Sequence, residues 1–112
     1  MVKVRSLAWH DEVWEIRFEI QEGVYRLDDY PVRITHLGRL PESEVADDLA
    51  LVATGLLQRH MRRGAVPPHA VVVNWTRVAQ FSQGESEDLS QAIARIDQKR
   101  RESVESPVPE QV

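Results

Sequence analysis

Apolar and charged residues alternate along residues 13–20, VWEIRFEI, in the clearest hydrophobic pattern of the chain. The apolar positions are Trp14, Ile16, Phe18 and Ile20. Because successive side chains of a strand point to opposite faces, this period of two predicts a strand with one face in the core and the other in water.

A hairpin is predicted to follow, with a two-residue turn at positions 22–23, since glycine readily adopts the positive φ that such turns need. With that turn, Tyr25 lies opposite Ile20. Leu27 then lies opposite Phe18, and all four apolar side chains share one face of the sheet.

Two weaker strands flank this hairpin. Residues 2–10 alternate until the pattern falters at Ser6 and Leu7, where a β-bulge is expected. Residues 32–36, VRITH, again place apolar side chains on one side and polar ones on the other. The first 37 residues therefore predict three or four strands of an antiparallel meander.

The period changes to that of an amphipathic helix between residues 41 and 63. Its apolar stripe is Val45, Leu49, Val52 and Leu56. Gly64 fits the position just past the helix end. Gly55, inside the helix, costs about 1 kcal/mol relative to alanine, and a glycine there often permits a close approach of another backbone. We expect this long helix to lie flat on the sheet.

Residues 66–81, VPPHAVVVNWTRVAQF, contain the most unusual stretch of the chain. The continuous β-branched run at 70–75 is typical of a strand covered on both faces, so a central or covered strand is predicted there, with Asn74 and Trp75 at its exit. A second helix is predicted at about 84–101, with Ser82 and Glu85 in capping-box spacing.

These elements predict a single α+β domain over residues 1–101, followed by a flexible tail at 102–112, which has two prolines and no periodicity. An antiparallel sheet of four to five strands, beginning with the N-terminal meander, packs against the long helix. The second helix follows the last strand. A chain of 112 residues can bury such a core without disulfides or a structural metal.

Composition excludes several classes of function. The chain has no cysteine, which removes disulfides, thiolate metal ligands and cysteine nucleophiles. A net charge of −4 provides no general attraction for nucleic acid. No apolar run reaches the length of a signal peptide or a membrane span, so we expect a cytoplasmic protein that does not bind a membrane.

Two basic clusters close the two predicted helices and are candidates for contacts with phosphate groups. They comprise Arg59, Arg62 and Arg63 in the first helix and Arg100 and Arg101 in the second. Each helix also begins with acidic residues, so the same charges complement the helix macrodipole, at roughly 0.3–1 kcal/mol per charge. We prefer this structural interpretation and keep nucleic-acid binding as an alternative.

Aromatic residues near strand ends are candidates for a partner-binding surface. They are Trp9, beside the first predicted turn, Tyr30, and Trp75, at the exit of the predicted central strand. Tryptophan is over-represented in the residues that dominate binding energies at protein interfaces. These three residues therefore form the first candidate site.

A pocket near the end of the 70–75 strand is a third possibility, with His69, Asn74 and Trp75 as its lining. It would serve a small ligand-binding domain or an enzyme. The four histidines lack metal-ligand spacing, and neither a phosphate-binding glycine motif nor a nucleophile elbow is present, so we predict no metal, no cofactor and no identified catalytic residue.

The sequence therefore favours a non-catalytic protein-interaction module, a subunit or accessory protein of a larger bacterial or phage assembly. Its partner would be another protein or a second copy of the same chain. The alternatives are a nucleic-acid-binding accessory protein that uses the helix-end arginines, and a small ligand-binding domain or enzyme.

Overall fold

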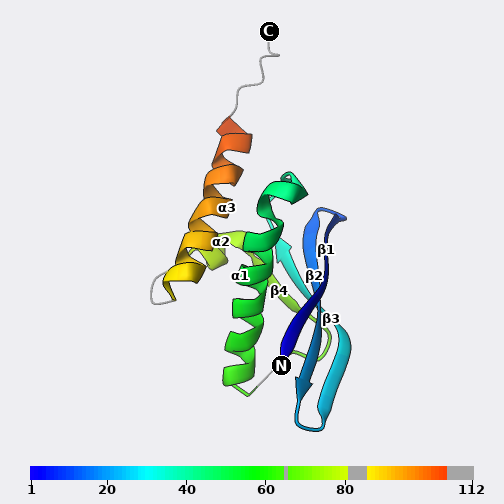
Figure 1. Ribbon diagram of the computed structural model, residues 1–112. Helices are drawn as coiled ribbons and strands as arrows, with labels where there is room; N and C mark the ends of the chain where they lie inside the picture. Colours follow the sequence, from blue (N-terminus) through cyan, green and yellow to red (C-terminus); the bar gives the residue numbers. More distant parts are fainter. Residues whose placement is uncertain (65, 81–85, 106–112) are drawn as a thin grey trace.

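A computed structural model describes residues 1–64, 66–80 and 86–105. Its elements are β1 (Val2–His10), β2 (Val13–Glu22), β3 (Tyr25–Thr35), α1 (Glu42–Arg62), β4 (Val71–Asn74), α2 (Trp75–Gln80) and α3 (Glu87–Glu105). The strands form one layer, and α1 lies between this layer and α3 (Figure 1). The predicted α+β class is confirmed.

The sheet is mixed, with four strands in the order β1-β2-β3-β4 among the described residues. β1, β2 and β3 form the expected antiparallel meander, but β4 pairs with β3 in parallel. The predictions of a purely antiparallel sheet and of a possible fifth strand are therefore wrong. The cause is the connection, because α1 carries the chain back along the sheet, and a strand that returns through a crossover helix runs parallel to the strand before it.

β4 lies at the edge of the sheet, so the prediction of a central, doubly covered strand is also wrong. Val71 is buried, but Val72 is 62% exposed. Three consecutive valines fit either a central or an edge strand, because their sequence shows no alternation that would reveal an exposed face. The strand ends at Asn74, and Trp75 begins the short helix α2, which the sequence analysis missed.

The β2–β3 hairpin differs from its predicted register. Its turn lies at residues 23–24, and Ile20 pairs with Leu27. A register shift then brings Phe18 opposite Tyr30 instead of Leu27. The irregularity expected near Ser6 is confirmed by a second register shift between β1 and β2.

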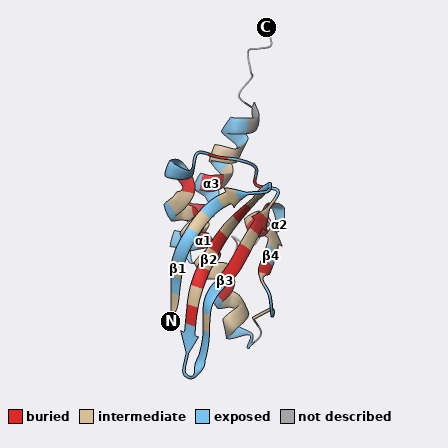
Figure 2. Cartoon of the chain, turned by 90° about the vertical axis from the view of Figure 1, so that its right-hand side faces the viewer, coloured by how far each residue is buried: buried red, intermediate tan, exposed pale blue. Residues whose placement is uncertain are grey.

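The core lies between the inner face of the sheet and α1, and buried residues of α2 and α3 extend it to the other side of α1. Along β2 the buried side chains are those of the predicted alternation, and Figure 2 shows buried positions recurring along β2 and β3. The predicted long helix is confirmed, and its buried residues are Val45, Leu49, Val52, Ala53 and Leu57. Gly64 follows the helix with a φ of 76°, a left-handed conformation that glycine adopts without strain and that ends the helix.

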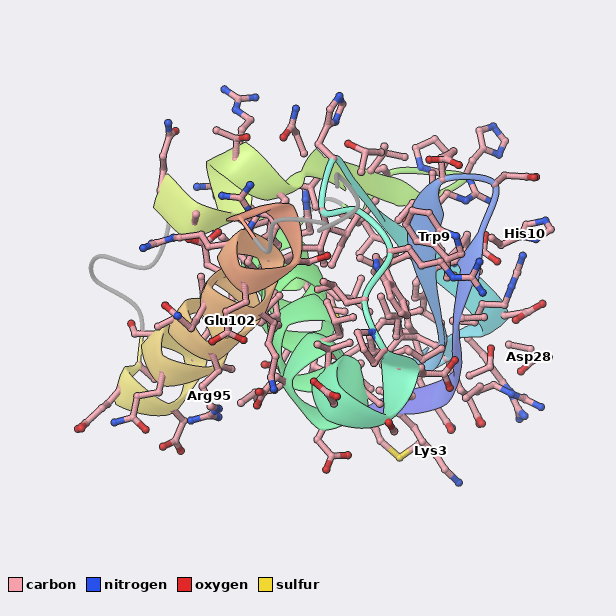
Figure 3. All side chains as sticks on the ribbon, turned by 90° about the horizontal axis from the view of Figure 1, so that it is seen from above. Lys3, Trp9, His10, Asp28, Arg95 and Glu102 are labelled. Atoms are coloured by element: carbon pink, nitrogen blue, oxygen red, sulfur yellow. The ribbon has the colours of Figure 1, made fainter. Side chains whose placement is uncertain are left out.

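α3 packs antiparallel to α1. Two ion pairs show this direction, because the later base in α3 binds the earlier acid in α1. Arg95 binds Asp48 at 2.8 Å, and Lys99 binds Glu44 at 2.9 Å. In Figure 3, Arg95 extends from α3 on the side where α1 lies.

A glycine permits this packing. A Cβ atom at Gly55 would lie 3.0 Å from Leu89 Cδ2, so this glycine accommodates a side chain of α3 rather than a backbone. The predicted cap at residues 82–85 lies outside the described residues, and the Ser86 hydroxyl accepts a hydrogen bond from Leu89 N instead. α3 continues to Glu105, beyond the predicted start of the tail at 102, and residues 106–112 lie outside the described part of the chain.

The turn between β1 and β2 stores strain that a substitution can relieve. Asp11 and Glu12 have φ values of 53° and 67°. A left-handed conformation costs a residue other than glycine about 1–2 kcal/mol. We expect Glu12→Gly to raise the free energy of unfolding by roughly 0.5–1 kcal/mol, as measured by urea denaturation. Ala8→Gly, in the extended backbone of β1, should lower it, and a loss of stability in both variants would contradict the strain argument.

Candidate functional site

A large hollow in the described part of the molecule lies beside the edge strand β4. It has a volume of about 610 Å³ and is bounded by β4, the C-terminal half of α1 and α2. We call it the β4-edge groove, and its lining comprises Val71, Val72, Val73 and Asn74 of β4, Thr35 of β3, Arg77 of α2, and Leu56, Arg59, His60 and Arg63 of α1.

The groove follows the backbone edge of β4 rather than one face of the sheet. Successive side chains of a strand alternate between the two faces, yet all four residues of β4 line the groove. No strand pairs with the outer side of β4 in the described parts of the chain. The backbone N–H and C=O groups on that side are therefore the hydrogen-bonding groups that an added strand would use.

Positive charge gathers in this groove. Its lining contains three arginines and one histidine, and no acidic side chain among the described residues. Arg63 and Arg77 are exposed and form no ion pair with any described residue. The groove is thus a local basic site on a chain whose net charge is −4.

The five arginines of the nucleic-acid hypothesis do not form one surface. Arg59 and Arg63 line the β4-edge groove, whereas Arg62 borders a different depression beside the N-terminus. Arg100 and Arg101 both bind the Asp97 carboxylate, at 3.1 and 2.9 Å. Because α1 and α3 are antiparallel, their C-terminal ends lie at opposite ends of the molecule (Figure 1).

Arg77 is the one arginine of the described groove lining that the sequence analysis missed. It is an isolated base in the segment TRVAQ, so it belongs to neither basic cluster. Only the tertiary structure brings α2 beside the end of α1, and no local pattern in the sequence indicates this arrangement.

The three pocket candidates do not converge. Asn74 lines the groove, and its side-chain oxygen accepts a hydrogen bond from Thr76 N at 2.9 Å, which caps the start of α2. His69 is exposed and does not line the groove. Trp75 is buried, with 2% of its surface exposed. The predicted pocket at this strand end is therefore not formed by these three side chains.

Two of the three aromatic partner-binding candidates belong to the core. Trp75 is buried, and Tyr30 is 4% exposed, because its ring lies on the inner face of β3. Trp9 is partly buried and packs against Trp14, with ring centroids 5.7 Å apart. Figure 3 shows Trp9 directed toward the helices and His10 toward the other side of the sheet. Of the three, Trp9 alone keeps a partly exposed ring.

Polar atoms of the two buried aromatic residues hold β4 at both ends. The Tyr30 hydroxyl donates a hydrogen bond to the Pro67 carbonyl oxygen at 2.6 Å, in the segment that leads into β4. After β4, the Trp75 indole N–H donates to Asp97 Oδ1 of α3 at 2.9 Å. Burial also raises the pKa of Tyr30, so its hydroxyl stays a hydrogen-bond donor.

Asp97 is the acceptor that connects α2 with α3. Burial of its carboxyl acts to raise the pKa, but hydrogen bonds from Trp75, Arg101 and Arg100 outweigh this effect, so the pKa lies below the ordinary aspartate value. The carboxylate is therefore ionised at neutral pH and accepts all three donors.

No group of three or more metal-binding side chains gathers in the described residues. No described helix is both long and apolar enough to cross a membrane. A comparison with known protein families, curated proteins and solved structures found no match to this chain. The candidate site therefore depends on the geometry of the β4-edge groove.

We expect Asp97→Asn to lower the free energy of unfolding by about 1–2 kcal/mol at neutral pH, because it removes a charged acceptor from three hydrogen bonds. A lowered folded-state pKa means that the carboxylate stabilises the fold above the unfolded-state pKa of about 3.9 and loses this effect as the pH falls through the folded-state value. Urea denaturation from about pH 7 to about pH 2 should therefore show the difference between wild type and variant shrinking. A constant difference would contradict this account.

Tyr30→Phe removes the hydrogen bond that anchors the segment before β4. We expect a loss of about 1 kcal/mol in the free energy of unfolding. Relative to wild type, amide hydrogen exchange should accelerate more in Val71–Asn74 than in β2. Tyr25→Phe is the matched control, since Tyr25 is 49% exposed. Equal acceleration throughout the sheet would show that this hydroxyl has no local effect on β4.

Proposed function

We propose that this chain is a non-catalytic protein-interaction module, a subunit or accessory protein of a larger assembly, which binds another protein at the β4-edge groove. One observation carries the proposal: the backbone edge of β4 lies open inside a groove of about 610 Å³. Addition of a strand to an open sheet edge is a recurrent way for a domain to bind another protein.

The two edge strands of the sheet differ, and the difference favours β4 over β1 as the strand that pairs with a partner. β1 is an edge strand too, but a register shift interrupts it and Lys3 and Arg5 lie on it. Bulges and charges are devices by which proteins protect sheet edges from unwanted pairing. β4 has the sequence Val-Val-Val-Asn and an uninterrupted register with β3, so it has neither device.

The groove suits a protein segment better than a small molecule. Small-molecule sites enclose most of the ligand surface and direct a few polar groups at it. Here Arg63 and Arg77 are exposed to solvent, and Val72 is exposed beside them. A groove with exposed walls beside a strand edge can contact one side of an extended chain.

Nucleic-acid binding is the second candidate, because the groove is basic. Single-stranded nucleic acid is normally held by aromatic side chains that stack on the bases. The described lining of the groove contains no phenylalanine, tyrosine or tryptophan. We therefore rank nucleic acid below protein as the partner.

The proposal predicts that a charge on the β4 edge abolishes docking. Val72→Asp should weaken binding of the partner at least about tenfold, because aspartate disfavours strand pairing, while the free energy of unfolding falls by no more than about 1 kcal/mol. The control is Val24→Asp, since Val24 is a fully exposed valine in the turn between β2 and β3.

Proteins captured by wild type and by Val24→Asp, but lost with Val72→Asp, would be identified by quantitative mass spectrometry. Their affinities would then be measured with purified components. A partner that binds all three forms equally would place the docking site elsewhere.

A further inference from the structure

We infer that the partner presents an acidic segment in extended conformation, which adds to the outer side of β4 as a fifth strand. This inference rests on the proposed function, because it names the chemistry of the partner that docks in the β4-edge groove. It combines two properties of that groove, an open strand edge and a positively charged wall.

The charge of the groove wall differs from that of the outer face of the sheet. On that face arginines are matched by carboxylates, as in the pair Arg33–Glu15 at 2.8 Å. Arg63 and Arg77 lack such a match among the described residues, although both are exposed. Carboxylates brought by a partner would supply it, and complementary charge of this kind sets the specificity and the rate of association.

The basic wall of the groove and the edge of β4 are placed so that one extended segment can contact both. Val71 and Val73 pair with Val32 and Ile34, whose side chains are buried under the helices, so the inner side of β4 faces α1. A strand added to β4 would direct every second side chain to that same side. Acidic residues at alternate positions would therefore face the bases at the C-terminal end of α1.

A second copy of this chain does not fit the groove. Two-fold symmetric pairing of β4 with β4 would bring identical surfaces together, so the arginines of one copy would face those of the other. Like charges placed across an interface oppose association. An acidic partner avoids this repulsion and uses the same backbone edge.

A small anion also leaves part of the site unused. It could bind Arg63 or Arg77, but it would not contact the apolar side chains of β4 or Leu56, which line the same groove. A peptide with alternating acidic and aliphatic residues satisfies both the charge and the apolar surface.

The test uses synthetic peptides and the full chain. The first peptide has eight residues that alternate glutamate and valine. In the second peptide glutamine replaces glutamate, and in the third a central proline prevents strand pairing. Single-stranded oligothymidylate of similar length is the fourth probe. Affinities are measured by fluorescence anisotropy, and amide chemical shifts of residues 71–74 report where each probe binds.

We expect the acidic peptide to bind at β4, and the glutamine and proline peptides to bind at least about tenfold more weakly. Arg63→Glu and Arg77→Glu should each weaken the acidic peptide about tenfold. Arg39→Glu is the control, because it makes the same change in net charge at an exposed residue outside the groove.

Four results would overturn the inference. Equal binding of the glutamine peptide would leave docking at the edge intact but remove the requirement for acid. Equal binding of the proline peptide would show that docking does not require an added strand. Tighter binding of oligothymidylate through Arg63 and Arg77 would identify a nucleic-acid site. If no peptide binds while Val72→Asp still loses its partner, the proposed function stands and the partner chemistry is wrong.

Discussion

The apolar inner face of the meander has to be covered, and α1 is the element that covers it. β2 alone places Trp14, Ile16, Phe18 and Ile20 on this face, each almost fully buried. A helix of 21 residues, at a rise of about 1.5 Å per residue, is long enough to cross the sheet and return the chain to its far end. The next strand then runs in the same direction as β3 and joins the sheet as a parallel strand beside it. The position of β4 at the edge, and with it the groove, thus follows from how the core is closed.

β4 is short, and its position depends on contacts outside the strand ladder. A hydrogen bond from Tyr30 holds the segment before it, and one from Trp75 to Asp97 holds the segment after it. These tethers join β4 to β3 on one side and to α3 on the other. A binding edge that is already fixed in its bound conformation loses less conformational entropy when a partner docks. The buried aromatic residues therefore support binding through position, although their rings are not exposed to a partner.

Elements with a strong local period were predictable from the sequence. The alternation in β2 and the helical stripe of α1 each arise within a few residues, and both elements were found with nearly correct bounds. The parallel direction of β4 was not predictable, because Val71–Val73 has no alternation and its direction is set by α1. The role of Trp75 was hidden for a related reason, since its partner Asp97 lies on a later helix. Arg77 enters the groove only through tertiary packing, so local charge patterns pointed to the C-terminal ends of α1 and α3 instead.

The order in which the strands are connected determines the order in which the sheet is expected to assemble. β1 and β2 are joined by a two-residue turn, whereas β4 pairs with a strand about forty residues earlier in the chain. Closing so long a loop costs entropy before its contacts form, so β4 is expected to join the sheet after the meander has formed. The surface proposed for binding is then carried by the strand that joins the sheet last. A partner that pairs with β4 would stabilise the sheet with β4 in place by mass action. Its own strand would then complete the edge of the sheet.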